Sequence, residues 1–236
     1  MALANIGYAL AANENKTVGL VDLDCEAAAL HDLFRVPIGE ASLLTFLVPK
    51  NRLVTSLERH VVAVPIPKAT RQALFLIPTV TDSKVIDDVR WDKGVESFLK
   101  EEVFPAFGRL YNLDLLLIDS RSGVSSFAQF ALQICDLVIL VGRADRQNRA
   151  GLRKMVEVCR SCGKSYLSIL NGCPAPERNR AKVQGFVKHI ASERNFVIPY
   201  EEALYFDEMI STKDAPRSIV AKRYVEVAQT IDRELR

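Results

Sequence analysis

Apolar residues recur at helical spacing in the first segment of the chain and become continuous in the second. In the opening stretch MALANIGYALA, Leu3, Ile6 and Leu10 fall on one face of a helix. A short polar turn follows, and residues 17–23 then form an apolar run that ends at two aspartates. This pattern predicts a helix that leads into a buried strand.

Further apolar runs of strand length follow, several of them separated by amphipathic stretches. The runs cover residues 60–64, 73–77, 113–118, 137–141, 166–170 and 196–198. The longest amphipathic stretches cover residues 93–110, 146–162, 178–194 and 216–235. Short, continuously apolar strands that alternate with helices are typical of a parallel sheet covered on both faces. The sequence therefore predicts an α/β fold with a doubly wound, mostly parallel sheet.

Residues 36–92 follow a less regular pattern than the rest of the chain. Five prolines interrupt this segment: Pro37, Pro49, Pro65, Pro67 and Pro78. We expect an insertion or peripheral subregion within one domain that spans residues 1–236. A chain of 236 residues, 49% of them hydrophobic, can bury roughly 70–75% of its unfolded surface in a single core.

Composition excludes several classes of protein. The 31 lysines and arginines nearly balance the 29 acidic residues, so the net charge of +2 does not by itself indicate a nucleic-acid partner. Five cysteines are an odd number in a chain too long to need disulfide staples, which favours a reducing compartment. No apolar stretch approaches the roughly 18 residues of a membrane span, and no signal-peptide pattern is present. We expect a cytoplasmic protein that does not bind membranes.

Acidic residues follow two of the expected strands. Asp22 and Asp24 end the first strand, and Asp119 ends the strand at residues 113–118. Ligands of open parallel sheets bind beyond the carboxyl ends of the strands. A carboxylate there can hold Mg²⁺ through water, and a second can orient an attacking water. Each aspartate alone is equally compatible with capping the next turn or helix, but the three together favour a nucleotide site.

Several segments carry a resemblance to a known family. They are MALAN at the start, VDLDCEAAALHDLF (21–34), DLLLIDSRSG (114–123), CDLVILVGRADRQNRAG (135–151), ILNGCP (169–174) and VIPYEEAL (197–204). Their ordered set resembles the ParA/MinD branch of the P-loop ATPases, and in particular a bacterial subgroup whose phosphate loop runs directly into MALAN. The resemblance implies a P-loop NTPase-like fold that binds ATP and Mg²⁺.

The resemblance also implies roles for the strand-end residues. Asp24 matches the catalytic residue that positions the hydrolytic water, and Asp22 matches the acidic residue that precedes it near the metal. Asp119 matches the Walker B aspartate that holds magnesium through water. Ser120 and Gly123 match the switch segment that follows it.

The expected base site comes from the last two strands. Asn171 matches the asparagine that hydrogen-bonds adenine, a role that suits a carboxamide because it offers both a donor and an acceptor. Pro199 and Tyr200 match the loop that flanks the base. A simple turn in the sequence Asn-Gly-Cys-Pro is the alternative interpretation of Asn171.

One departure from the family pattern is large. The phosphate loop, K-G-G-x-G-[KR]-[ST], and the strand before it are absent, and the chain starts at the residue that should follow the loop. The Gly-Lys-Ser at 163–165 is not a substitute, because Val158 stands where G-x-x-x-x-G-K-S needs glycine and because a helix precedes it. We expect a misassigned start codon or a cut chain, with the strand and loop encoded upstream of Met1.

Other candidate sites are weaker. Cys159 and Cys162 have the spacing of a metal or redox pair, but no second close pair supplies the remaining ligands. His31, His60 and His189 have no serine or cysteine partner at a spacing that indicates a hydrolytic triad.

Two function hypotheses remain open. The first is an ATP-hydrolysing molecular switch that forms a homodimer in its ATP-bound state, directs an unknown protein partner, and is inactive in the form of these 236 residues. Two basic runs allow nonspecific DNA binding as well: Arg143, Arg146, Arg149, Arg153 and Lys154, and Arg178, Arg180, Lys182 and Lys188. The second is a pseudo-ATPase or protein-interaction module that does not bind nucleotide.

Overall fold

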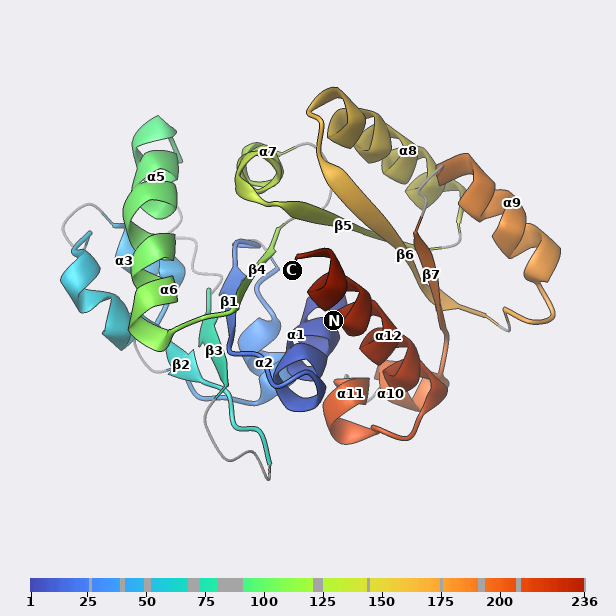
Figure 1. The fold of residues 1–236 in the computed structure, drawn as a ribbon, viewed down its shortest axis with the longest axis horizontal. Coiled ribbons are helices and arrows are strands. Elements are labelled where there is room, and N and C mark those ends of the chain that lie inside the picture. Colours follow the sequence, from blue (N-terminus) through green and yellow to red (C-terminus); the bar gives the residue numbers. More distant parts are fainter. Residues whose placement is uncertain are drawn as a thin grey trace. The chain divides into compact units, whose positions relative to one another are not determined.

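A computed structural model of the protein is shown in Figure 1. The structure describes residues 1–25, 27–38, 41–48, 52–67, 73–79, 91–120, 125–143, 145–174, 176–190, 194–206 and 209–235. The chain divides into two compact units. The first comprises Met1, Leu3 and Gly7–Arg121, and the second comprises Ala2, Ala4–Ile6 and Ser122–Arg236.

A four-stranded sheet forms the centre of the first unit. Its strands are β1 (Val18–Asp22), β2 (Val62–Ala63), β3 (Leu74–Ile77) and β4 (Leu115–Asp119), in the order β2-β3-β1-β4. β1 is fully buried and pairs in parallel with both β3 and β4, whereas β2 is antiparallel to β3. The parallel register places Asp22 directly opposite Asp119.

Helices cover both faces of this sheet. Helix α1 (Ala2–Asn13) lies close to the face that carries Leu20, because a Cβ on Gly7 would come within 2.7 Å of the Leu20 side chain. Gly19 points to the opposite face, where an added Cβ would lie 2.7 Å from Phe107 of α6 (Phe104–Tyr111). Neighbouring residues of one strand thus contact helices on opposite sides, as a doubly wound fold requires.

The helix expected at residues 93–110 is continuous but contains a wider turn. It consists of α5 (Lys93–Phe98), a π-helical turn at Leu99–Val103 and α6. In a regular α-helix, Pro105 would lack an N–H to donate and its ring would clash with the carbonyl four residues earlier. The wider turn avoids this clash. The remaining helices of this unit are α2 (Leu30–Phe34), α3 (Leu43–Leu47) and the 3-10 helix at Val54–His60.

The second unit contains a parallel three-stranded sheet, β5-β6-β7. The strands are β5 (Leu137–Gly142), β6 (Ser165–Cys173) and β7 (Asn195–Pro199). Its helices are α7 (Ser126–Ile134), α8 (Arg146–Ser161), α9 (Arg180–Ile190), α10 (Glu202–Phe206), α11 (Ser211–Asp214) and α12 (Ile219–Glu234). Leu170 packs in a core with residues of α7, α8 and α9, whereas α12 packs against β7 (Figure 1).

Side-chain caps fix where four of the helices begin. Asp92, Ser125, Asp145 and Ser218 each accept a hydrogen bond from the backbone N–H three residues later, at the start of α5, α7, α8 and α12. The cap at Ser218 explains why the last helix begins at Ile219, after the start expected from the apolar pattern.

The predicted fold class is confirmed, with one correction. All seven apolar runs contain strands, and β3, within residues 36–92, lies inside its sheet. However, the strands form two sheets and not one. In the described part of the chain, β4 and β5 each pair on one edge only, and each is partly exposed along its length. The seven runs all pair within these two sheets, and no described strand pairs with both β4 and β5.

Candidate functional site

The carboxyl ends of β1 and β4 bring two of the predicted site residues together. Asp22 and Asp119 are neighbours across the parallel pair. The backbone N–H of Leu23 donates to the carbonyl oxygen of Asp119 at 2.9 Å and holds the chain beyond β1 against the end of β4. The sequence-based expectation that these carboxylates share one sheet edge is therefore confirmed.

Asp22 is almost fully buried, with 1% of its surface exposed. Its Oδ1 accepts a hydrogen bond from the Asp24 backbone N–H at 3.0 Å, and its Oδ2 accepts one from the Leu30 N–H at 3.4 Å. Burial, and then the nearby charge of Asp119, raise the pKa of Asp22 to about 7, although the backbone N–H groups oppose that shift. Asp22 therefore organises the turn after β1 and carries a charge that its surroundings disfavour.

Asp119 and Asp24 lie near Asp22, and we call these three aspartates the acidic edge. Burial raises the pKa of Asp119; the Met1 amino group opposes the increase, and the charge of Asp24 adds to it. Asp24 is half-buried, and its Oδ1 accepts a hydrogen bond from the Ala27 N–H at 3.1 Å. Ser120, the next residue after β4, is also half-buried, whereas Gly123 lies outside the described residues.

The donor set at this edge suits a magnesium ion only in part. Carboxylate oxygens are the ligands that Mg²⁺ prefers, and burial raises the pKa of both Asp22 and Asp119, so their charged forms are disfavoured in these surroundings. Yet no group of three His, Cys, Asp or Glu side chains within the described ranges could hold a metal. Asp119 and Asp24 could therefore supply only part of a coordination shell, and water or a ligand's oxygens must supply the rest.

The raised pKa of Asp22 predicts a stability that falls with pH. The folded state holds the Asp22 proton up to about pH 7, while the unfolded chain releases it near pH 4, so the free energy of unfolding decreases between these values. We expect Asp22→Asn to remove this decrease. At pH 8 the loss of the buried charge adds at most about 4 kcal/mol of stability, and this gain is partly offset because the amide nitrogen of asparagine cannot accept the backbone N–H that one carboxylate oxygen accepts. Urea unfolding at pH 5 and pH 8, with a chelator present, measures both effects.

The matched control for this prediction is Asp32→Asn. The Asp32 side chain is 75% exposed, so its charge is largely screened by solvent. We expect Asp32→Asn to keep the parent's decrease between pH 4 and pH 7. If Asp22→Asn and the parent follow parallel curves, burial does not shift the pKa of Asp22 as described.

Asn171 lies at an irregularity near the end of β6. Leu170 pairs with Val197 and Cys173 with Pro199, so two residues of β6 oppose a single residue of β7. Gly172 makes this bulge possible because its φ is +63°, a conformation that costs other residues energy. Asn171 is therefore in a bulged strand, and the interpretation as a simple turn is wrong.

The loop after β7 lies next to this bulge. Pro199 is paired with Cys173, and the Tyr200 N–H donates to the Cys173 carbonyl oxygen at 2.9 Å. The Tyr200 side chain is 40% exposed. The structure thus brings Asn171, Pro199 and Tyr200 to the carboxyl ends of two neighbouring strands, as the sequence predicts.

Tyr224 of α12 is a partner of Asn171 that the sequence did not reveal. Its hydroxyl donates a hydrogen bond to Asn171 Oδ1 at 2.8 Å, and only 1% of Tyr224 is exposed. In the sequence, Tyr224 falls on the apolar face of an amphipathic helix and looks like an ordinary core residue. No local signal distinguishes it, because its partner is 53 residues away.

The expected site residues fall into two groups, one in each unit. Asp22, Asp24, Asp119 and Ser120 belong to the first unit, and Asn171, Pro199 and Tyr200 belong to the second. The roles that the family resemblance implies for them stay predictions.

The cysteines form no disulfide: Cys159 is buried, Cys162 is exposed, and both carry free thiols. Burial also raises the pKa of Cys25, next to the acidic edge, to about 12, so this thiol is not a reactive nucleophile.

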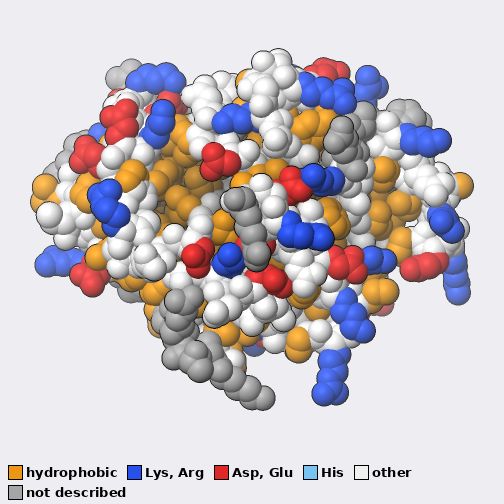
Figure 2. All heavy atoms as spheres, viewed as in Figure 1, with side chains coloured by type: hydrophobic (Ala, Val, Ile, Leu, Met, Phe, Trp, Pro, Cys, Tyr) orange, Lys and Arg blue, Asp and Glu red, His pale blue; other side chains and the backbone are white. Residues whose placement is uncertain are grey.

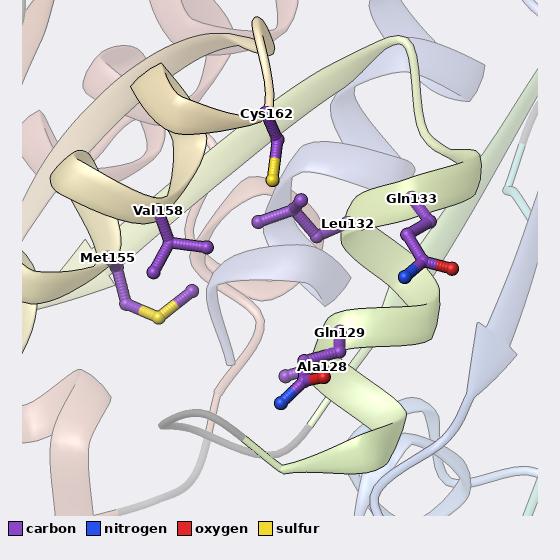
Figure 3. A pocket seen from close by; sticks show the side chains of 7 residues that line it. All are labelled: Ala128, Gln129, Leu132, Gln133, Met155, Val158 and Cys162. Atoms are coloured by element: carbon purple, nitrogen blue, oxygen red, sulfur yellow. The ribbon is translucent and has the colours of Figure 1, made fainter.

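A small apolar pocket lies between α7 and α8 (Figure 3). Its volume is about 150 Å³, and it is lined by Ala128, Gln129, Leu132, Gln133, Met155, Val158 and Cys162. Pockets for drug-sized ligands usually measure about 300–1,000 Å³. This pocket is too small for a nucleotide and contains none of the predicted site residues.

The basic residues that the sequence singled out lie on or beside α8 and α9, which pack against each other. Arg153, Lys154, Lys182 and Lys188 are exposed there, and Figure 2 shows Lys and Arg side chains on this part of the surface. Within the described ranges, no helix is both long enough and apolar enough to cross a membrane.

Known structures share this fold. MinD in the MinC:MinD cell division complex of Aquifex aeolicus superposes with a TM-score of 0.77, at 19% sequence identity, over 98% of this chain and 88% of that chain. The septum site-determining protein MinD of Pyrococcus horikoshii, complexed with Mg-ADP, gives a TM-score of 0.76 at 19% identity, over 99% and 90% of the two chains. A ParA family ATPase from Chlorobium tepidum gives 0.74 at 19% identity, over 97% and 92%.

No protein-family model and no curated protein matches this chain. The similarity to these known structures is therefore one of three-dimensional structure. At such low sequence identity it establishes the fold of the chain. The chain has the doubly wound α/β fold of nucleotide-binding ATPases. More narrowly, it has the fold of MinD and of the ParA-family ATPases.

Proposed function

We propose that this protein is a nucleotide-dependent molecular switch of the ParA/MinD type. It binds ATP with Mg²⁺ and hydrolyses ATP when a phosphate-binding loop is present. The observation that carries the proposal is the pair Asp22 and Asp119, which are in register at the carboxyl ends of adjacent parallel strands. In open α/β sheets, ligands bind beyond this edge.

The charges at the acidic edge support a role with a cation. The pKa values of Asp22 and Asp119 are raised, so both carboxylates would be stabilised by a divalent ion that remains partly bound to water and phosphate. In this proposal Asp119 holds Mg²⁺ through water, Asp22 orients the turn beneath it, and Asp24 orients the attacking water. Asn171, Pro199 and Tyr200 contact the base.

The finer functional assignments are part of the same proposal. We expect a homodimer in the ATP-bound state, a protein partner whose identity is open, and a cytoplasmic location in a bacterial cell. The exposed basic residues of α8 and α9 support weak, nonspecific DNA binding through phosphate contacts, which salt would weaken.

The second candidate is a pseudo-ATPase or interaction module without nucleotide. One observation favours it: the 236 residues contain no loop of the K-G-G-x-G-[KR]-[ST] pattern. Asp22, Asp24 and Asp119 then present only negative charge to a polyanionic ligand, so we expect residues 1–236 to bind Mg-ATP weakly or not at all.

Asp119→Ala tests the proposed metal role. The experiment uses a version of the protein in which an apolar strand and a loop of this pattern precede Met1, called here the loop-extended protein. We expect Asp119→Ala to weaken ATP binding in the presence of Mg²⁺ by at least about tenfold and to leave the weaker binding in a chelator unchanged. Isothermal titration calorimetry with and without Mg²⁺ measures the Mg²⁺-dependent binding and the weaker binding separately.

Asp32→Ala is the control, since this exposed side chain is not part of the acidic edge. A loop-extended protein that binds ATP equally well with and without Mg²⁺ contradicts the metal role of Asp119. A loop-extended protein that is folded but binds no nucleotide favours the second candidate.

A further inference from the structure

Asn171 has an unusual partner for a residue that would read a base. Its carbonyl oxygen accepts a hydrogen bond from the Tyr224 hydroxyl, whereas its amide nitrogen forms no hydrogen bond within the described residues. Tyr224 belongs to α12, which follows β7 in the sequence. The carboxamide is therefore held at one end and open at the other.

The buried phenol decides which way the carboxamide points. Tyr224 is 1% exposed, and burial raises its pKa, so the hydroxyl keeps its proton. A buried O–H needs an acceptor, and Asn171 Oδ1 is the acceptor that the structure provides. If the amide turned over, its N–H₂ group would face the phenol and the phenol proton would have no acceptor.

The strand pairing is irregular at Asn171, where the other end of the amide lies. The bulge at Asn171 and Gly172 breaks the regular pairing with β7, and bulges commonly redirect a side chain. Asn171 is half-buried, and its amide nitrogen is not among the fully buried polar atoms that lack a hydrogen-bond partner in the described part of the chain. What the site offers a ligand is thus mainly a pair of hydrogen-bond donors.

We propose that Tyr224 is a positioning residue that fixes the Asn171 carboxamide with its Nδ2 donors outward, so that this site recognises a purine chiefly through a ring-nitrogen acceptor. The 6-amino group of adenine contributes less, because one acceptor position of Asn171 Oδ1 is already occupied by Tyr224. This inference rests on the proposed nucleotide site.

The first experiment tests the orientation without any ligand. The side-chain amide signals of Asn171 in residues 1–236 are assigned by NMR from their disappearance in Asn171→Asp. We expect Tyr224→Phe, which removes only the hydroxyl, to shift these signals and to speed the exchange of their protons. Tyr166→Phe is the matched control, since Tyr166 lies near the opposite end of β6, and it should leave them unchanged.

The second experiment tests which edge of the base is read. Nucleosides are the probes because they carry no phosphate and need neither Mg²⁺ nor a phosphate loop. We expect adenosine and purine riboside, which lacks the 6-amino group, to bind within about threefold of each other. Either 1-deazaadenosine or 7-deazaadenosine, each lacking one ring-nitrogen acceptor, should bind at least about tenfold more weakly. In Tyr224→Phe this difference should shrink.

Each outcome has a distinct meaning. Unchanged Asn171 signals in Tyr224→Phe overturn the positioning role. Purine riboside that binds as weakly as the deaza nucleosides overturns recognition through the ring nitrogen. If no nucleoside perturbs Asn171, the base-reading role is overturned, whereas the metal role of Asp119 in the proposed function is tested separately and can still hold.

Discussion

Asp24→Ala in the loop-extended protein should lower the rate of ATP hydrolysis by at least about 100-fold and leave ATP affinity nearly unchanged. Asp24 is half-buried at the acidic edge, one of its oxygens accepts the Ala27 N–H, and its other oxygen accepts no hydrogen bond from the described residues. That second oxygen is available to orient a water, whereas neither oxygen is expected to contact the phosphates. Steady-state phosphate release and equilibrium ATP binding measure the two effects independently.

Two further variants sharpen this result. Asp24→Asn keeps an oxygen that can accept the Ala27 N–H but loses the charge, so it should be as slow as Asp24→Ala while retaining the parent's stability. Asp32→Ala, on an exposed carboxylate nearby, should hydrolyse ATP at the parent rate. Hydrolysis by Asp24→Ala at the parent rate would show that another group orients the water.

A thermal melt should show no measurable change when millimolar Mg-ATP is added to residues 1–236, and a clear rise for the loop-extended protein. The backbone N–H groups and lysine of such a loop supply most of the charge-assisted contacts to the β- and γ-phosphates. Ligand at about 100 times its dissociation constant adds roughly 2.7 kcal/mol of stability. For a domain of this size, that corresponds to a rise of about 5–10 °C.

The added strand should also stabilise the protein without nucleotide. β4 and β5 are apolar strands that each pair on a single edge in the described part of the chain, and open edges leave backbone groups to be satisfied by water. We expect the loop-extended protein to melt at a higher temperature even before ATP is added. A rise of several degrees with Mg-ATP in residues 1–236 would show that the loop is not needed for tight binding.

The sequence by itself determined the strands, the longer helices and part of the candidate site. Strand and helix positions follow from the spacing of apolar residues over short windows, which is why the runs at 17–23, 113–118 and 137–141 became β1, β4 and β5. The acidic edge was also predictable, because Asp22 and Asp119 directly follow such runs and parallel strands end at a common edge.

Only the tertiary structure decided the division into two sheets, the bulge at Asn171 and the contact with Tyr224. Strand pairing depends on which apolar surfaces compete for burial across the whole chain. The sequence pattern of β4 does not say that, among the described strands, it pairs with β1 alone. A hydrogen bond between residues 53 positions apart leaves no periodic trace in either segment. Tyr224 therefore looks like core in the sequence, and its role in holding Asn171 follows only from the folded positions of β6 and α12.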